Sequence, residues 1–230
     1  MNNVFEIKNV SKIYGDNEET RVHALRKVDL NIEEGEFTAI VGPSGSGKTT
    51  MLNVMSGLDE VTEGTVHLGG KDISHMSGNE LSDFRRDHIG FIFQAYNLIP
   101  VLTVRENVEY VMLLQGVDSQ ERKKRVNEVL GEVGLQGKED RYPNELSGGQ
   151  KQRVAVVRAI VSKPKIILAD EPTANLDSQT GTELVEMMKD LNKKYNFTFV
   201  FSTHDPIIME KAKRLVVLKD GEIHKDEIRN

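Results

Sequence analysis

A glycine-rich loop at residues 42–49, Gly-Pro-Ser-Gly-Ser-Gly-Lys-Thr, is the first segment of this 230-residue sequence that could do chemistry. It fits G-x-x-x-x-G-K-[ST], in which successive backbone N–H groups converge on phosphate oxygens. Lys48 adds a charge for the β- and γ-phosphates, and Thr49 offers a hydroxyl to Mg²⁺. A chance match is expected in roughly one per cent of chains this long. We therefore expect nucleotide phosphates and Mg²⁺ to be bound by Gly42, Pro43, Ser44, Gly45, Ser46, Gly47, Lys48, Thr49 and Thr50.

Two acids, Asp170 and Glu171, follow the apolar run 166–169. Ligands of open α/β sheets bind at the carboxyl ends of strands, so Asp170 is placed to hold Mg²⁺. Glu171 is placed to accept a proton from the attacking water or to orient it. His204 ends the next strand-like run and could sense the γ-phosphate. Without the phosphate loop, these residues could equally be two solvent-exposed acids and a loop histidine with no catalytic role.

A second glycine-rich segment, Leu146-Ser147-Gly148-Gly149-Gln150, predicts another helix start that can bind an anion. Serine is a good N-cap residue, and the two glycines leave backbone N–H groups uncovered. The segment lies too far along the chain to extend the phosphate loop. Its contacts are expected from Ser147, Gly148, Gly149 and Gln150.

The elements around these residues predict an α/β fold. Phe37–Val41 is an apolar run of the kind buried on both faces of a sheet, and it leads directly into the loop. Alternating strands and helices imply a mostly parallel sheet with helices on both faces. Further strands are expected at 4–10, 28–32, 166–169, 197–201 and in a hairpin at 216–223 that turns at Asp220-Gly221. Helices are expected at 49–55 and 179–194.

The middle of the chain, from about residue 81 to 162, has more helical spacing, with helices expected at 107–115, 119–133 and 148–161. We therefore expect a single domain over residues 1–230. Its catalytic core and antiparallel β subdomain would comprise 1–90 and 163–230, with a helical subdomain at about 91–162.

The amino-acid composition limits the kinds of partner and cofactor that the chain can bind. The net charge of −6 argues against a broad nucleic-acid footprint, so no nucleic-acid partner is expected. The sequence has no cysteine, which excludes disulfides and thiolate zinc sites. No apolar stretch reaches the roughly 20 residues of a membrane span, and the start has no signal-peptide pattern. We expect a cytoplasmic protein that can still dock onto a membrane protein.

With these motifs on hand, the chain resembles the nucleotide-binding subunits of ABC transporters over essentially its whole length. Residues 42–49 resemble the Walker A loop, 170–171 the end of Walker B, and 146–150 the signature motif. Residues 174–177 resemble the D-loop, and His204 the switch histidine. Gln94 resembles the Q-loop glutamine, which implies contact with Mg²⁺ and the reacting phosphate. Tyr14 stands where the family places the aromatic that stacks on adenine; the alternative is an ordinary strand aromatic.

The resemblance implies a fold and a mechanism. The fold would be a P-loop NTPase core with an N-terminal antiparallel β subdomain and a helical subdomain that carries the signature motif. Two copies would pair head to tail around two ATP molecules, with Ser147, Gly148 and Gly149 of one copy meeting the γ-phosphate held by Lys48 of the other. Hydrolysis at Glu171 would release the pair and move a transmembrane partner.

The stretch 90–100 and the insertion at 16–20 resemble the lipoprotein-release and macrolide-export branch (LolD and MacB type). There, Ala95–Val104 would receive an integral membrane permease, which would hold this chain on the inner face of the membrane. Tyr96, Leu98, Ile99 and Leu102 would be the apolar contacts, unless they pack into the core. Sugar-import ATPases are disfavoured because a long C-terminal regulatory region is absent.

Three other functions stay open. An ABC ATPase can drive transmembrane signalling, as in cell-division relatives, rather than transport. A soluble ABC protein acting on ribosomes or DNA is less well supported, since this chain has one cassette and no heptad run. A binding module without turnover is opposed by the intact Glu171 and His204. The sequence identifies no cargo.

Overall fold

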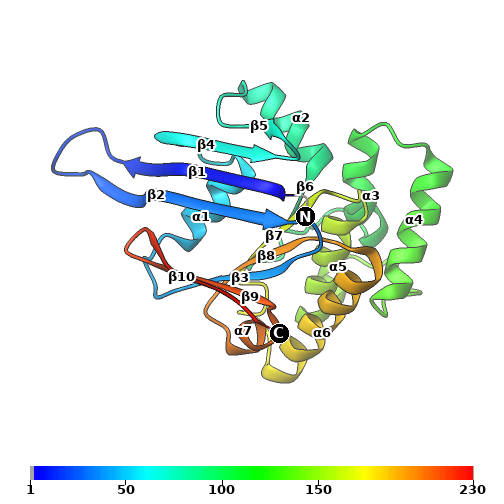
Figure 1. Ribbon diagram of the computed structural model, residues 1–230. Helices are drawn as coiled ribbons and strands as arrows, with labels where there is room; N and C mark the ends of the chain where they lie inside the picture. Colours follow the sequence, from blue (N-terminus) through cyan, green and yellow to red (C-terminus); the bar gives the residue numbers. More distant parts are fainter. Residues whose placement is uncertain (1–2, 230) are drawn as a thin grey trace.

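The computed structural model describes residues 3–229, which form two sheets and the helices packed on them (Figure 1). One sheet has four strands in the order β2-β1-β4-β5, and the other has six in the order β10-β9-β3-β8-β7-β6. This arrangement confirms the predicted α/β class with an antiparallel β subdomain and a mostly parallel core sheet.

The six-stranded sheet is the part that positions the phosphate loop. Its central strands β3 (Phe37–Val41), β8 (Phe199–Thr203) and β7 (Ile166–Asp170) are parallel neighbours and almost wholly buried. Such strands are apolar throughout because helices or a second sheet cover both faces. The sheet is completed by β6 (Ile89–Ile92), parallel to β7, and by β9 (Arg214–Lys219), parallel to β3. The edge strand β10 (Glu222–Ile228) is antiparallel to β9.

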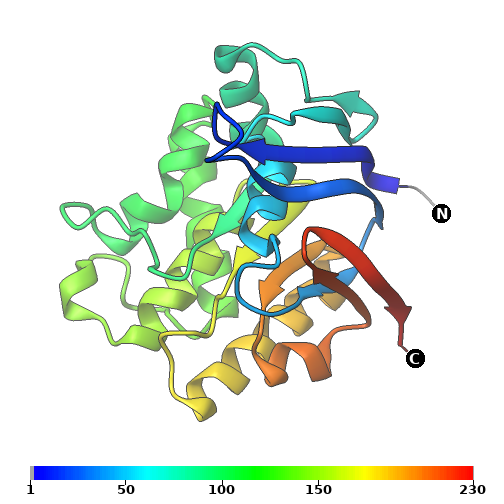
Figure 2. The same cartoon turned by 90° about the vertical axis from the view of Figure 1, so that its left-hand side faces the viewer.

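The antiparallel sheet consists of β1 (Asn3–Tyr14), β2 (Val22–Glu33), β4 (Glu63–Leu68) and the short β5 (Lys71–Asp72). Buried side chains alternate along β1 and β2, and they pack on helix α1 (Lys48–Ser56). The same cluster contains Ile40 and Val200 of the core sheet. Helix α1 is therefore enclosed between the two sheets, as Figure 2 shows from the side.

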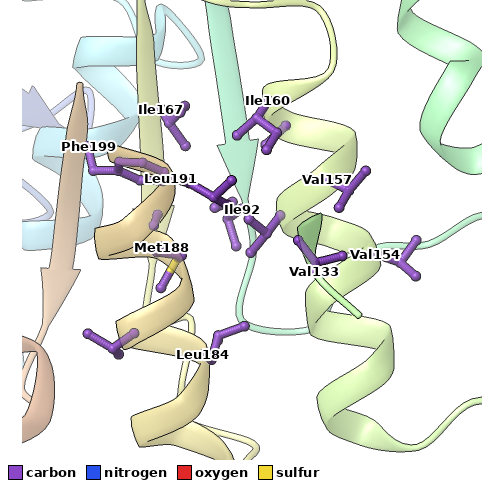
Figure 3. Close-up of a cluster of buried hydrophobic side chains, with 14 of the residues drawn as sticks. Ile92, Val133, Val154, Val157, Ile160, Ile167, Leu184, Met188, Leu191 and Phe199 are labelled. Atoms are coloured by element: carbon purple, nitrogen blue, oxygen red, sulfur yellow. The ribbon is translucent and has the colours of Figure 1, made fainter. Parts of the chain in front are cut away.

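Helices cover the opposite face of the core sheet. They are α3 (Val104–Leu114), α5 (Gly148–Ile160) and α6 (Ser178–Tyr195), with a 3₁₀ turn, η1, at Pro143–Glu145. Helix α4 (Ser119–Glu132) packs on α3 and α5 at the outer edge of the molecule (Figure 1). Figure 3 shows α5 side chains such as Val157 and α6 side chains such as Met188 packed with Ile92 and Ile167 of the sheet. The signature segment and the core sheet thus share one hydrophobic cluster. Helices α2 (Gly78–His88) and α7 (Pro206–Lys211) complete the fold.

The structure corrects several expectations from the sequence. We expected helical structure from about residue 81, but strand β6 intervenes at Ile89–Ile92 and ends inside the stretch assigned to the helical subdomain. A Cβ on Gly90 would lie 2.4 Å from the carbonyl oxygen of Ala159, so glycine lets α5 approach this strand closely. The strand expected at 197–201 begins two residues later, and β4, β5, α2 and α7 were not predicted. Within residues 3–229, no helix is both long and apolar enough to cross a membrane.

Candidate functional site

The phosphate loop connects β3 to α1, as the sequence predicts. Helix α1 begins at Lys48, and its N-cap, Gly47, has φ 102° and no side-chain cap. The first N–H groups of the helix therefore have no side-chain acceptor. Because a helix N-terminus carries partial positive charge, this end is suited to an anion.

At two positions of this loop only glycine fits, because backbone atoms of other strands lie too close for a Cβ. A Cβ on Gly42 would lie 2.0 Å from the carbonyl oxygen of Leu218, and one on Gly47 would lie 2.4 Å from that of Ala24. Gly45, by contrast, has φ 78° and nothing within 4 Å of an added Cβ. The loop is thus packed tightly against β2 and β9 and is open where Gly45 lies.

Polar groups in the loop are available to a ligand. The Lys48 ammonium donates to the carbonyl oxygens of Gly42 (2.8 Å) and Pro43 (3.0 Å), so it is curled over its own loop. The buried Ser46 hydroxyl has no hydrogen-bond partner among the described residues. An unpaired buried polar group is costly.

Asp170 ends strand β7 near the start of α1. Burial raises the pKa of its carboxyl, an effect that Ser202, Lys48 and Thr49 oppose. The Asp170 Oδ1 atom is buried and has no hydrogen-bond partner within residues 3–229. Asp170 and Thr49 together fit Mg²⁺, which takes one or two protein oxygens and completes its shell with phosphates and water. The described residues contain no cluster of three or more potential metal-binding side chains.

Glu171 and His204 are brought together. Glu171 Oε1 lies 2.6 Å from His204 Nδ1, and Glu171 Oε2 accepts a hydrogen bond of 3.0 Å from the Thr203 hydroxyl. The His204 side chain is 75% exposed and that of Glu171 only 15%. Glu171 also has φ 43°, an uncommon conformation for a residue with a side chain. The pair therefore lies at the surface of the core, next to Asp170.

Tyr14 ends β1 and is partly exposed. Its hydroxyl donates to Asp59 Oδ2 over 2.6 Å, and Lys12 Nζ lies 4.9 Å from the ring centroid. Burial, together with Asp59, raises the pKa of the phenol. Asp59 Oδ2 also accepts from Asn53 of α1, so the tyrosine is linked to the helix that follows the phosphate loop.

The signature segment begins helix α5 with a capping box. The Ser147 hydroxyl accepts from the Gln150 N–H over 3.3 Å, and the Gln150 side chain accepts from the Ser147 N–H over 3.1 Å. A Cβ on Gly149 would lie 2.5 Å from Cγ2 of Thr180, whereas one on Gly148 would face the Tyr96 hydroxyl at 3.1 Å. Gly149 therefore permits close packing on α6, in addition to any exposure of its N–H group.

Gln94 forms no hydrogen bond with residues 42–50 in the part of the chain that the structure describes. It is exposed, and its carbonyl oxygen accepts from the Asn175 side chain over 2.8 Å. Arg158 of α5 donates to the carbonyl oxygens of Tyr96 and Asn97, whose φ values are 61° and 49°. The stretch after Gln94 is thereby tied to both the D-loop segment and the signature helix.

The predicted residues thus fall into two groups. Residues 42–50, Asp170, Glu171 and His204 lie at the carboxyl end of the core sheet. Across residues 3–229, no hydrogen bond joins the signature segment 146–150 to residues 42–50. Sequence reasoning missed Thr203 as a partner of Glu171, and Asn175 and Arg158 as partners of the segment after Gln94. Only Thr203 had a sequence signal, its place beside His204 at a strand end.

Comparison with known proteins identifies the family to which the chain belongs. The model of the family described as ABC transporter matches residues 25–174. The chain belongs to the ABC transporter family. It is an ABC ATPase cassette that binds ATP, which the loop and the acid pair had indicated.

This ABC ATPase is similar to several proteins along nearly its whole length. It is 46% identical to the ABC transporter ATP-binding protein MJ0796 of Methanocaldococcus jannaschii over 97% of both chains. It is 40% identical to the bacitracin export ATP-binding protein BceA of Halalkalibacterium halodurans, covering 96% of this chain and 87% of that one. It is also 44% identical to the macrolide export protein MacB of Mannheimia succiniciproducens, over 97% of this chain and 34% of that protein.

A solved structure of MJ0796, described as a dimeric post-hydrolysis state bound to ADP and Pi, superimposes with a TM-score of 0.88. The match has 45% sequence identity and covers 98% of this chain and 99% of that one. The fold of the ABC ATPase is therefore that of an ATP-binding cassette.

Proposed function

We propose that this chain is the ATP-hydrolysing subunit of an ABC-type export or lipoprotein-extraction complex and that two copies enclose two ATP molecules. The observation that carries the proposal is the separation within one chain. The phosphate loop and acid pair form one half of a site, and within residues 3–229 no hydrogen bond joins them to residues 146–150 at the start of the signature helix. A second copy, turned head to tail, would supply the missing half.

The residues of one copy would bind the nucleotide and activate the attacking water. The N–H groups of residues 42–49 and the Lys48 ammonium hold the phosphates, while Tyr14 stacks on adenine. Glu171 orients the attacking water and takes its proton, and His204 contacts the γ-phosphate. Asp170 and Thr49 would hold Mg²⁺, with Gln94 approaching when the site closes; the ion supplies charge neutralisation for phosphoryl transfer. The chain's own donors stabilise charge that develops on the phosphoryl oxygens.

The second copy would contribute Ser147, Gly148 and Gly149. The Ser147 hydroxyl accepts from Gln150, so its proton is free to donate to a γ-phosphate oxygen. The N–H groups of the two glycines add the positive end of helix α5. The dimeric MJ0796 structure, which is 45% identical, supports this pairing.

The permease would dock on Ala95–Val104 at the inner face of the membrane. Val101 is 77% exposed and Ile99 is 37% exposed, while Leu98 packs against the core. Tyr110, Leu113 and Leu114 share one face of α3 and are exposed as well. Large exposed apolar side chains that lie together favour a protein contact. The names of BceA and MacB support export as the work that the permease performs.

Glu171→Gln tests the central claim. It should keep ATP binding, stall turnover, and convert the monomer to a stable dimer on addition of ATP, as measured by light scattering. Glu183→Gln, on the exposed surface of α6, is the matched control and should hydrolyse ATP normally. A Glu171→Gln protein that stays monomeric at saturating ATP would refute the paired arrangement.

A separate experiment tests the membrane partner. Val101→Glu should leave the ATPase activity of the isolated chain unchanged and abolish co-purification with the permease from its own cells. Glu128→Ala, on the exposed face of α4, is the control. If Val101→Glu still co-purifies with the permease, the docking surface lies elsewhere. A permease that couples ATP hydrolysis to an extracytoplasmic enzyme, without moving cargo, would favour the signalling alternative.

A further inference from the structure

Both carboxylate oxygens of Glu171 are held by hydrogen-bond donors from the end of strand β8. His204 Nδ1 lies 2.6 Å from Oε1, and the Thr203 hydroxyl donates to Oε2 over 3.0 Å. The main chain is held too, because the Glu171 N–H donates to the Ser202 carbonyl over 2.9 Å. The φ of 43° at Glu171 is therefore maintained by three contacts with one strand end.

The Thr203 hydroxyl has a fixed direction. Its oxygen accepts a hydrogen bond of 2.9 Å from the Asp205 N–H, so its proton is left to point at Glu171. Asp205 caps helix α7 through the Ile207 N–H and also contacts the Thr173 hydroxyl, on the segment that follows Glu171. The donor is thus built into a partly buried network that joins both sides of Glu171.

The two donors differ in freedom. Thr203 is fully buried at the last position of β8, where it pairs with Val41 at the end of β3. The His204 side chain is 75% exposed and can rotate without disturbing the core. Movement of His204 toward a γ-phosphate would break its contact with Oε1, and Thr203 would then be the side chain that still holds the carboxylate.

We propose that Thr203 is a positioning residue for Glu171, fixing the direction of its carboxylate while the His204 contact is made and broken. The inference rests on the proposed role of Glu171 in orienting water. It assigns the hydroxyl of Thr203 a part in turnover that is separate from nucleotide binding. It also makes the His204–Glu171 contact a feature of the nucleotide-free state.

Thr203→Val removes the hydroxyl and keeps the shape of the side chain. It should lower kcat roughly 10- to 100-fold, the range expected when a reacting group is slightly misplaced, and leave KM for ATP unchanged. Thr203→Ser should restore kcat because it retains the donor. Thr203→Ala provides a second measurement without the hydroxyl if the valine variant does not fold.

Thr198→Val is the matched control. Thr198 is also a buried threonine that accepts a backbone hydrogen bond, from the Gly35 N–H over 3.0 Å, but it lies just before the other end of β8. It should lose a similar amount of thermal stability and keep its kcat. Equal losses of kcat in Thr198→Val and Thr203→Val would assign Thr203 a merely structural role and overturn the proposal.

A double-mutant cycle with Glu171→Gln completes the test. If Thr203 acts through Glu171, Thr203→Val should not reduce further the residual turnover of Glu171→Gln. A further reduction by the same factor as in the wild type would overturn the proposal and leave the role of Glu171 intact. Wild-type turnover in Glu171→Gln itself would instead refute the proposed function, so the two failures are distinguishable.

Discussion

Helices α1 and α5 both begin with a glycine-rich segment, but their N-terminal N–H groups are capped differently. The N-cap of α1 is Gly47, with no side-chain cap, so its N–H groups depend on a ligand. The N-cap of α5 is Ser147, which forms a reciprocal capping box with Gln150. A capping box satisfies two N–H groups that a helix otherwise leaves unpaired. We therefore propose that the first end is a phosphate site by itself, and that the second is a stable helix start that adds donors to a site formed elsewhere.

The glycines of the two segments also serve different purposes. Gly42 and Gly47 allow the phosphate loop to pass close to the backbone of other strands. Gly149 accommodates Cγ2 of Thr180 on α6. The same residue type thus shapes a binding loop in one region and permits helix packing in the other. Substitutions made in pairs test whether the two helix ends differ in this way.

Lys48→Ala should have the largest effect. Among residues 3–229 its ammonium donates hydrogen bonds only to carbonyls of the loop, so the fold should persist. Turnover should fall about 10²- to 10³-fold through loss of charge at the phosphates. Lys151→Ala, in the first turn of α5, should leave ATP affinity of the monomer unchanged. Release of inorganic phosphate measures turnover, and titration with a fluorescent ATP analogue measures affinity. Equal loss of affinity in the two variants would abolish the distinction between the two helix ends.

Gly149→Ala should lower the free energy of unfolding by about 2 kcal/mol, a typical cost of overpacking. Thr180→Ser should rescue it, because serine lacks Cγ2 and keeps the hydroxyl that donates to Asp177 over 2.6 Å. Gly45→Ala should cost only about 1 kcal/mol, since its φ of 78° is strained but its surroundings are open. Urea unfolding of the single and double variants measures this. Without rescue by Thr180→Ser, packing on α6 is not the reason for glycine at 149.

Ser147→Ala should cost about 1 kcal/mol of stability through loss of its cap. The control is Ser77→Ala, because Ser77 forms the same capping box with Glu80 at the start of α2. Both variants should bind ATP as monomers. Only Ser147→Ala should weaken ATP-driven dimerisation, measured in the Glu171→Gln background. Equal dimerisation of the two would remove Ser147 from the interface.

The phosphate loop could be predicted from sequence because its requirements are local. A strand, a few glycines and one lysine adjoin in the chain, and Asp170 and Glu171 could be added because parallel strands end at one edge. The capping box of Ser147 and Gln150 is equally local, although only the N-cap role of Ser147 was predicted from the sequence. The helix ends were therefore accessible from residue types and spacing.

Other features depended on segments distant in the chain. The contact of Gly149 with Thr180 and the hydrogen bond from Thr203 to Glu171 required knowledge of how α6 and β8 lie. Strand β6 has four residues, too few for a periodic pattern, and forms because β7 pairs with it. The exposure of Ile99 and the core packing of Leu98 likewise depended on tertiary contacts that no local rule decides.

The smallest expected effect concerns pH and contrasts two aspartates. Burial raises the pKa of Asp170 above its ordinary value of 3.8, whereas hydrogen bonds from Thr180 lower the pKa of Asp177, the N-cap of α6. The unfolded chain has the ordinary value for both. The folded state therefore holds the Asp170 proton more tightly, and this contribution to stability is lost as pH rises through the raised pKa. The Asp177 contribution is present above 3.8 and is lost as pH falls through the lowered pKa.

Asparagine at the two positions should consequently act in opposite directions. In the nucleotide-free protein, Asp170→Asn should increase the free energy of unfolding at pH 7, with a smaller increase at pH 4, because the buried charge is removed. Asp177→Asn should decrease it at pH 7. Urea unfolding at both pH values, with each variant subtracted from wild type, measures the difference. A loss of stability in Asp170→Asn would mean that neighbouring groups already compensate the buried Asp170 carboxylate in the absence of nucleotide.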